Sequence, residues 1–494
     1  MNRFKLLVSG LGVAIFAISS TLGQNQFDAL RYSQIDVTGT ARFSAMGGAF
    51  GALGGDMSSM TVNPAGIGVF TRTTGSATLG ILSVGTDATY LGIESSNVKM
   101  NANIGNAGFV ARFKRKRGQD KQWAWKAFHV GVSYNRTANF HRRTSIVGVN
   151  ESSSVVDGWV NQLNTSTVPI NYADIPTELS PSSEFSNAYL GWGTFLIDTM
   201  PGSVNSYMRN FAPSYGQTQQ VRETTKGSMG EIALSFGGNF GNALYIGATI
   251  GIPRLSYEVE RTYSESDTQD TIANFGSFSR TDFLRATGNG LNIKFGMIYR
   301  PAKWLRLGGA IHSPTWFAID EEFTTSMTSD LETAGQYTLA TANGAFDYRL
   351  QTPFRAIGSL AFVIGKIGLI SADYEYVNYS LAQLNSRSYS FDSENADVKS
   401  QLHWAGNIRL GTEWRIKSFS VRGGFAINGD PYSGVYNFDN TRYSLGAGFR
   451  FKRFFVDMSY NLHRLVNSYE LYDAAIAETL TMQHSVITTF GFRF

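Results

Sequence analysis

The chain has 494 residues, of which 16% are charged and 13% aromatic, and it contains 52 glycines, no cysteine and a formal net charge of +4. Soluble proteins average about 25% charged residues and about 7% glycine, so this composition is unusual for a soluble protein. The small, scattered charge gives no nucleic-acid footprint, and the lack of cysteine excludes disulfides and thiolate metal sites. A mean hydropathy of -0.14, with no later apolar run near the roughly 20 residues of a membrane helix, excludes a helical membrane protein.

Residues 1–23 have the pattern of a secretory signal peptide. Arg3 and Lys5 form a basic start, residues 6–18 an apolar core, and residues 19–23 a small-residue exit. An uncleaved anchor helix is the alternative, but the apolar core is too short to span a bilayer. We therefore expect export, with cleavage near Gly23.

Residues 24–70 are small, glycine-rich and turn-forming, above all in the runs 42–56 and 62–68. Glycine lets the backbone pass close to neighbouring chain, as a segment threaded into a crowded lumen requires. The run lacks the spacing of a phosphate-binding loop. We expect this segment to be a hatch that plugs a barrel, with key residues Gly47, Gly48, Asn63, Pro64, Ala65 and Gly66.

From residue 71 to residue 494, apolar and polar residues alternate in segments joined by short turns. In residues 441–462, for example, one face of the first segment comprises Tyr443, Leu445, Ala447, Phe449 and Phe451. A period of two is typical of strands, and six such pairs predict twelve of them. A first strand near 71–82 and a last at 482–494 bring the total to about fourteen, the even number that a bacterial barrel requires.

The last strand carries the clearest signal for location. Val486, Phe490 and Phe494 fall on one face, while the other face is small or charged. Pairing of this strand with the first would close a barrel and remove the open sheet edge. An apolar outside around a polar inside predicts an all-β transmembrane barrel in a cell outer membrane, in contact with its lipid. Barrel-assembly machinery is expected to bind this C-terminal strand.

The connections opposite the short turns are long and polar, and we expect loops near 83–102, 138–227, 260–284 and 321–350 on the extracellular side. The longest, 138–227, carries an aromatic cluster that is a candidate apolar groove for ligand capture: Tyr189, Trp192, Phe195 and Leu196. Packing of these residues against the barrel rim is the alternative.

The small-residue run followed by Asn63-Pro64-Ala65-Gly66 resembles the hatch of the FadL/OmpP1/TodX long-chain fatty-acid transporters. The order of signal peptide, hatch and about fourteen strands fits that family over the whole chain. The motifs Ser313-Pro314-Thr315 and Thr352-Pro353-Phe354-Arg355 resemble its Bacteroidetes-type branch.

The resemblance implies passive uptake of hydrophobic compounds such as long-chain fatty acids. It also implies release through a lateral opening at a kink in the third strand, which we expect at 122–135, with Gly131 as the candidate position. Two alternatives stay open: a protein-docking component of a secretion or surface-anchoring system, and a general porin. The hatch argues against an open porin.

Charged side chains on the inner face, such as Arg409, Glu413 and Arg422, suggest either a charge-paired ladder or a site for a ligand carboxylate. The histidines predicted to face inward lie in different strands without metal-ligand spacing. No motif assembles a serine, a histidine and a carboxylate. We therefore expect hydrophobic small molecules as ligands, and neither a cofactor, a metal nor an enzymatic activity.

Overall fold

The structure is a computed structural model that describes residues 24–494 except 115–123, 168, 174, 176–184, 435–437 and 473–474. The signal peptide predicted at 1–23 lies outside the described residues. In the part that is described, no helix is long and apolar enough to cross a membrane.

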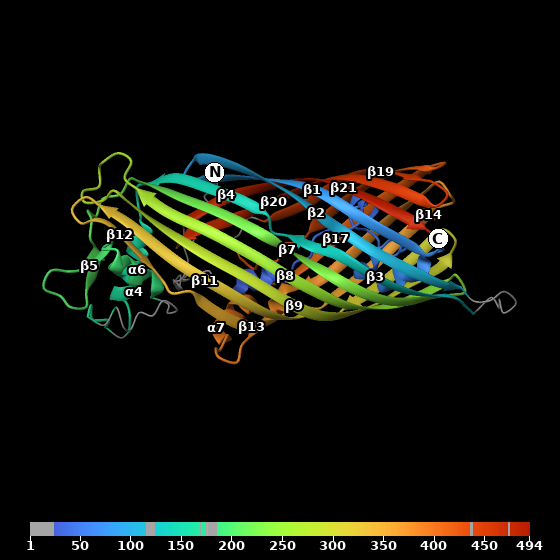
Figure 1. Cartoon of the computed structure of the whole chain (residues 1–494), viewed down its shortest axis with the longest axis horizontal. Helices are drawn as coiled ribbons and strands as arrows, with labels where there is room; N and C mark the ends of the chain where they lie inside the picture. Colours follow the sequence, from blue (N-terminus) through green and yellow to red (C-terminus); the bar gives the residue numbers. More distant parts are fainter. Residues whose placement is uncertain are drawn as a thin grey trace, which may run out of the picture.

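The fold is a closed 14-strand antiparallel β-barrel, as the alternation predicted (Figure 1). It closes where the last strand pairs with the first, from Thr74↔Arg493 to Thr89↔Glu478. At four places, successive strands form one stave of the wall: β3 with β4, β10 with β11, β12 with β13 and β14, and β15 with β16. The sheet contains β1 (Thr74–Tyr90), β2 (Ile93–Lys114), β3 (Trp125–Asn139), β4 (Arg142–Asn150), β7 (Gln217–Phe240), β8 (Leu244–Ser266), β9 (Ser277–Ala302), β10 (Leu305–His312), β11 (Trp316–Leu331), β12 (Gly335–Ala340), β13 (Gly344–Gln351), β14 (Arg355–Ile364), β15 (Gly368–Asn378), β16 (Gln383–Asn385), β17 (Trp404–Ile416), β18 (Phe419–Asn428), β19 (Asp439–Arg450), β20 (Phe454–Tyr472) and β21 (Ala475–Arg493).

The strands are longer than the alternation predicted, and several expected loops are strands. The expected loop 83–102 is replaced by β1 and β2, which continue to a tight turn at Leu91 and Gly92, with φ of 48° and 80°. Much of the expected loops 260–284 and 321–350 likewise belongs to strands. The loop predictions were therefore wrong in extent.

These strands were predicted as loops because the apolar residues move from the outward to the inward face along each long strand. On the outward face of β8, exposed isoleucines give way to polar residues after Pro253; this face comprises Ile246, Ile250, Ile252, Arg254, Ser256, Glu258 and Glu260. On its inward face, buried polar Thr249 gives way to buried Leu255, Tyr257 and Val259. A strand needs an apolar outside only where it meets lipid. The outer half of the barrel thus lies beyond the lipid-facing band. There the polar residues face outward and the apolar residues face inward.

The N-terminal segment lies inside the barrel, as short helices against the inner wall (Figure 1). They are α1 (Gln26–Ser33), α2 (Ala41–Ala45), α3 (Ser59–Val62) and the 3-10 helix η1 (Pro64–Val69). Asn25 caps α1 by accepting from Phe27 N at 2.9 Å, and Thr40 caps α2 by accepting from Phe43 N at 3.2 Å.

The chain between β4 and β7 forms a cap over the outer mouth of the barrel. It contains α4 (Val155–Asn164), α6 (Ser186–Gly193) and the hairpin β5 (Ile197–Thr199) and β6 (Tyr207–Arg209). Glu265 of β8 holds the start of α4, accepting from Ser154 Oγ at 2.6 Å and Val155 N at 3.0 Å. Beside the cap, η2 (Tyr379–Leu381) and α7 (Asp392–Gln401) connect the ninth and tenth staves.

The C-terminal residue offers a test of the terminal-strand prediction. Phe494 N donates to Thr73 O at 2.9 Å and the ring is 70% exposed, beside Phe109 and Phe492. We expect Phe494→Glu to block insertion, because a charge would replace the lipid-facing terminal aromatic that assembly machinery is expected to bind. Heat-modifiable gel migration and surface labelling measure this. Phe451→Glu, which alters an exposed aromatic away from the terminus, is the matched control. Normal folding of Phe494→Glu would contradict the prediction.

Candidate functional site in the barrel lumen

A buried carboxylate ties the hatch to the wall. Glu413 of β17 accepts from three guanidinium groups: Arg42 of α2 at 2.7 Å, Arg415 at 2.6 Å and Arg422 at 2.8 Å. Arg422 also bonds Asp457 at 2.6 Å and is almost fully buried. Removing one partner of a buried pair costs about 3–5 kcal/mol, because the other charge is left without compensation. The pairing with Arg42 therefore fixes α2 in the lumen.

Asn63 joins the two parts of the hatch to the opposite wall. Its Nδ2 donates to Gly51 O at 2.6 Å and to Met297 O at 3.1 Å, while its Oδ1 accepts from Ala65 N at 3.1 Å. Pro64 starts η1, where its missing N–H costs nothing. The Asn-Pro-Ala tripeptide thus ends one hatch segment, begins the next and contacts β9.

The predicted hatch glycines lie at close approaches. Gly47 has φ of 60°, and a Cβ there would lie 2.8 Å from Phe425 O of the wall. Gly48 also has a positive φ, of 79°, and Gly66 faces Ser59 Oγ, 2.6 Å from where a Cβ would be. A side chain at Gly47 would push the hatch away from the wall, whereas side chains at Gly48 and Gly66 would disturb packing within the hatch.

Around α1 the lumen is rich in buried apolar side chains, with buried charged residues such as Arg261, Asp282 and Glu321 among them. The inner faces of the long strands and of α1 form one buried cluster that includes Tyr32, Met229, Leu255, Tyr257, Val259, Leu284, Phe317, Ile319 and Tyr348. Arg31 lies over the Tyr257 ring, with 4.5 Å from Cζ to the ring centroid. Apolar side chains around a lumen suit the passage of apolar molecules rather than ions.

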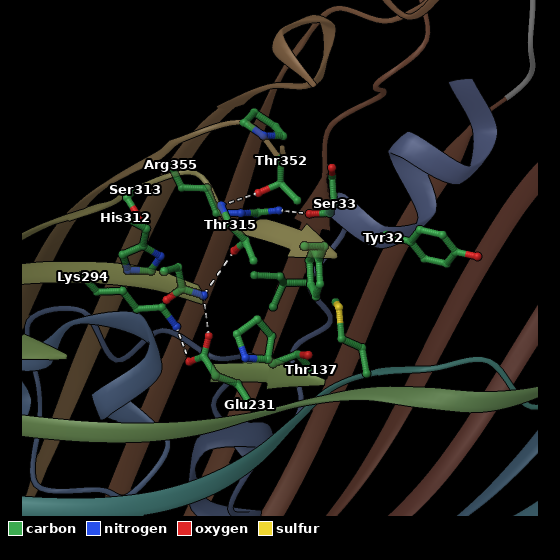
Figure 2. A pocket seen from close by; sticks show the side chains of 16 residues that line it. Tyr32, Ser33, Thr137, Glu231, Lys294, His312, Ser313, Thr315, Thr352 and Arg355 are labelled. Carbon is green, nitrogen blue, oxygen red and sulfur yellow. Dashed lines mark hydrogen bonds and ion pairs between the residues drawn. The ribbon is translucent and has the colours of Figure 1, made fainter. Parts of the chain in front are cut away.

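A small cavity, with a volume of about 30 Å³, lies where this apolar cluster meets the polar part of the lumen (Figure 2). Its apolar lining comprises Tyr32, Ile35, Met229, Pro253, Phe317 and Pro353. On its polar side, Lys294 is paired with Glu231, and Asn292 Nδ2 donates to Glu231 at 2.9 Å. One end of the cavity is therefore apolar and the other polar, as an amphiphile requires.

The two motifs predicted from the resemblance meet at this cavity, which sequence reasoning did not foresee. Thr315 N donates to Thr352 Oγ1 at 2.9 Å, and Arg355 bonds both Glu375 at 2.7 Å and the carbonyl of Ser33. Each motif lies between two strands of one stave, where a proline interrupts the ladder. These prolines are the sequence signal that could have predicted the cavity.

Several polar atoms of the lining residues lack a partner among the described residues, namely Ser33 Oγ, Thr137 Oγ1 and His312 Nδ1. The hydroxyl of Tyr32 also lacks a partner there, but it points away from the cavity (Figure 2). Burial raises the pKa of the Tyr32 hydroxyl, so this group stays a neutral donor. Buried polar atoms without partners are costly, and a bound polar group would satisfy them.

Beside the cavity, the ladder between β2 and β3 is interrupted. Their pairing ends at Asn106↔Asn135, so within the described chain residues 93–105 of β2 are in a ladder only on the β1 side. Hatch residues lie at this break: Asp36 N donates to Thr137 O at 2.8 Å, and Thr38 Oγ1 bonds Arg136 O. We refer to this place as the β2–β3 break.

Gly131 does not lie at the break, which corrects its assignment as the kink position. It is paired regularly with Val110 of β2 and Ser235 of β7. A Cβ at Gly131 would lie 2.9 Å from hatch atoms of Ile67 and Met60, so this glycine makes room for the hatch. Against β7, β3 has register shifts between Trp125 and Ala127 and between Arg136 and Ala138, and the second of these lies at the break.

The candidate capture residues lie in the cap. Leu196 is fully buried in its apolar core, and Tyr189 and Trp192 pack against that core half-buried. Trp192 stacks on Tyr172, with 6.2 Å between ring centroids. Phe195 is 45% exposed, its ring centroid 4.5 Å from that of Tyr337. Of the four, Phe195 is therefore the one whose ring is exposed.

These features define a class: a closed antiparallel barrel whose own N-terminal segment fills the lumen. No family model and no curated protein matches the chain. The solved FadL homologue of Pseudomonas aeruginosa matches with a TM-score of 0.57 and 11% identity, over 94% of this chain and 100% of that one. The toluene transporters TodX of P. putida (0.52; 12%; 93% and 99%) and TbuX of Ralstonia pickettii (0.50; 14%; 93% and 99%) match similarly. The chain thus has the FadL/TodX-type fold that its residues predicted.

Deleting residues 25–60 tests whether the hatch closes the pore. The deletion removes Arg42 but leaves Glu413 paired with Arg415 and Arg422, so we expect the barrel to fold. The variant should conduct ions in planar bilayers, whereas the intact protein should be nearly silent, because polar inward side chains would then line an open path. Large steady conductance from the intact protein would contradict this prediction.

Two single substitutions separate ligand capture from packing in the cap. We expect Phe195→Ser to weaken binding of a fluorescent fatty acid about tenfold, since burying a large apolar side chain is worth roughly 1.5–3 kcal/mol. Trp192→Ser should instead make the cap sensitive to protease, because Trp192 packs against its core. Limited proteolysis and fluorescence titration measure both. Unchanged affinity in Phe195→Ser would exclude capture by this residue.

Proposed function

We propose that the protein is an outer-membrane channel for passive uptake of hydrophobic compounds such as long-chain fatty acids. The proposed role is transport and not catalysis. The FadL homologue and the toluene transporters share its fold, which is consistent with this role.

One observation carries the proposal: the amphipathic cavity lies beside the β2–β3 break. Thr137 lines the cavity and follows the last β2–β3 pair by two residues. On the hatch, Ile35 lines the same cavity, and its neighbour Asp36 bonds Thr137. A molecule in the cavity is thus separated from the break by one short stretch of hatch.

The path we propose begins at the cap, follows the apolar cluster around α1 and leads to the cavity. An acyl chain would leave water at each step, with about 0.8 kcal/mol gained for each buried CH₂ group. The carboxylate would lie at the polar end, near Lys294 and Arg355. Exit through the β2–β3 break would deliver the chain to lipid without crossing water.

An engineered disulfide tests this exit, since the chain has no cysteine of its own. Asp36 N and Thr137 O are 2.8 Å apart, so Asp36→Cys with Thr137→Cys should place the two sulfurs within bonding range. We expect oxidation to stop fatty-acid transfer into proteoliposomes, and a reductant to restore it, because the hatch could no longer leave the break.

The matched control staples the hatch elsewhere. Ala41 N donates to Thr489 Oγ1 at 2.7 Å, so Ala41→Cys with Thr489→Cys joins α2 to β21. This pair should leave transfer unchanged. Equal transfer by the oxidised and reduced Asp36–Thr137 pair would exclude exit at the break, whereas block by both pairs would show that the whole hatch must move.

A further inference from the structure

A second, larger cavity lies on the other side of the hatch, at the short-turn end of the barrel. Its volume is about 280 Å³, and the residues around it come from the hatch and from the ends of β1, β10, β15, β17, β19, β20 and β21. Six of them are arginines: Arg42, Arg72, Arg306, Arg415, Arg450 and Arg493. Short turns lie on the periplasmic side of such barrels, so we call this space the periplasmic cavity.

Acidic side chains do not balance these guanidinium groups. The lining contains two carboxylates, Asp56 and Asp457. Asp457 is bonded by Arg422, and Glu413 nearby is shared by three arginines. Asp56 accepts from Thr40 Oγ1 at 2.7 Å, and burial raises the pKa of its carboxyl, which opposes a full negative charge there. The periplasmic cavity therefore carries excess positive charge.

Several donors in this space have no partner in the part of the chain that the structure describes. Nε of Arg306, Nε of Arg450 and Oγ of Ser76 are buried and unbonded, and all three residues line the cavity. Arg306 uses one other nitrogen to bond Leu53 O of the hatch at 2.8 Å. Arg493 lies over the Phe455 ring, 4.9 Å from its centroid, without an acidic partner among the salt bridges described. The hatch thus holds Arg306 in place, and an aromatic ring holds Arg493.

We propose that the periplasmic cavity is a binding site for an oxyanion, a carboxylate or a phosphate, held by Arg306 and Arg450. Guanidinium groups bond these planar or tetrahedral oxyanions through paired N–H donors, and partial burial strengthens such charge-assisted bonds. The oxyanion is either a free periplasmic anion or the head group of an amphiphile. The site does not depend on the proposed uptake path, because the hatch separates the two cavities.

The test uses the full-length protein in a nonionic detergent. Inorganic phosphate is the probe for a free anion, and sodium decanoate the probe for an anionic head group, with sodium chloride at equal ionic strength as the reference. We expect at least one probe to bind in calorimetric titration. Arg306→Gln with Arg450→Gln should weaken that binding about tenfold or more, since charge-assisted bonds are the strong ones.

The matched control, Arg349→Gln with Arg387→Gln, removes two exposed arginines from the outer half of the barrel. It should leave binding unchanged. Binding of phosphate supports a free anion, and binding of decanoate alone supports an amphiphile head group, provided that either is lost in the Arg306/Arg450 variant. No binding of either probe beyond the chloride reference, or equal binding by wild type and that variant, would overturn the proposal. Heat-modifiable migration verifies that each variant is a folded barrel.

Discussion

A strand in hydrocarbon must have both edges paired, because no water is present to bond its free N–H and C=O groups. Closure of the barrel satisfies this constraint along most of the wall, including the long ladder between β1 and β21. The β2–β3 break is an exception, and there the hatch supplies part of the missing pairing through Asp36 and Thr38. The hatch is therefore part of the wall as well as a plug.

The charged interior depends on the same segment. Taking an arginine or a glutamate out of water is costly unless the charges compensate one another. Glu413 forms ion pairs with three arginines, and one of them, Arg42, belongs to the hatch. Glu375 is shared by Arg355 and Arg409, and Arg355 also bonds the hatch at Ser33. The ladder of charges and the hatch therefore hold each other in position.

The sequence was informative where lipid constrains it. Phe490 and Phe494 alternate with small or charged residues because one face meets hydrocarbon, and this pattern sufficed to predict the barrel, its strand number and its closure. Beyond the lipid the constraint ends, so Leu255 faces inward and Glu258 outward, and the extent of the strands was missed. We predicted the opening at Gly131, but the break lies elsewhere. A glycine in a strand can indicate a kink, but it can equally indicate the close approach of another segment, here of Ile67. The cavity joins residues from six staves and the hatch, and spacing along the chain does not reveal this arrangement.

The position of the break relative to the two cavities has a consequence for gating. The stretch between Ser33 and Thr38 contacts the amphipathic cavity at one end and the β3 edge at the other, while α2 follows it and is anchored at Glu413. A ligand that fills the amphipathic cavity competes for the space of Ile35 without touching the anchor. Displacement of this short stretch would open the break while Arg42, Asn63 and the periplasmic cavity stay in place. On the uptake path proposed above, lateral exit would therefore need only a small local change and would leave the axial pore closed.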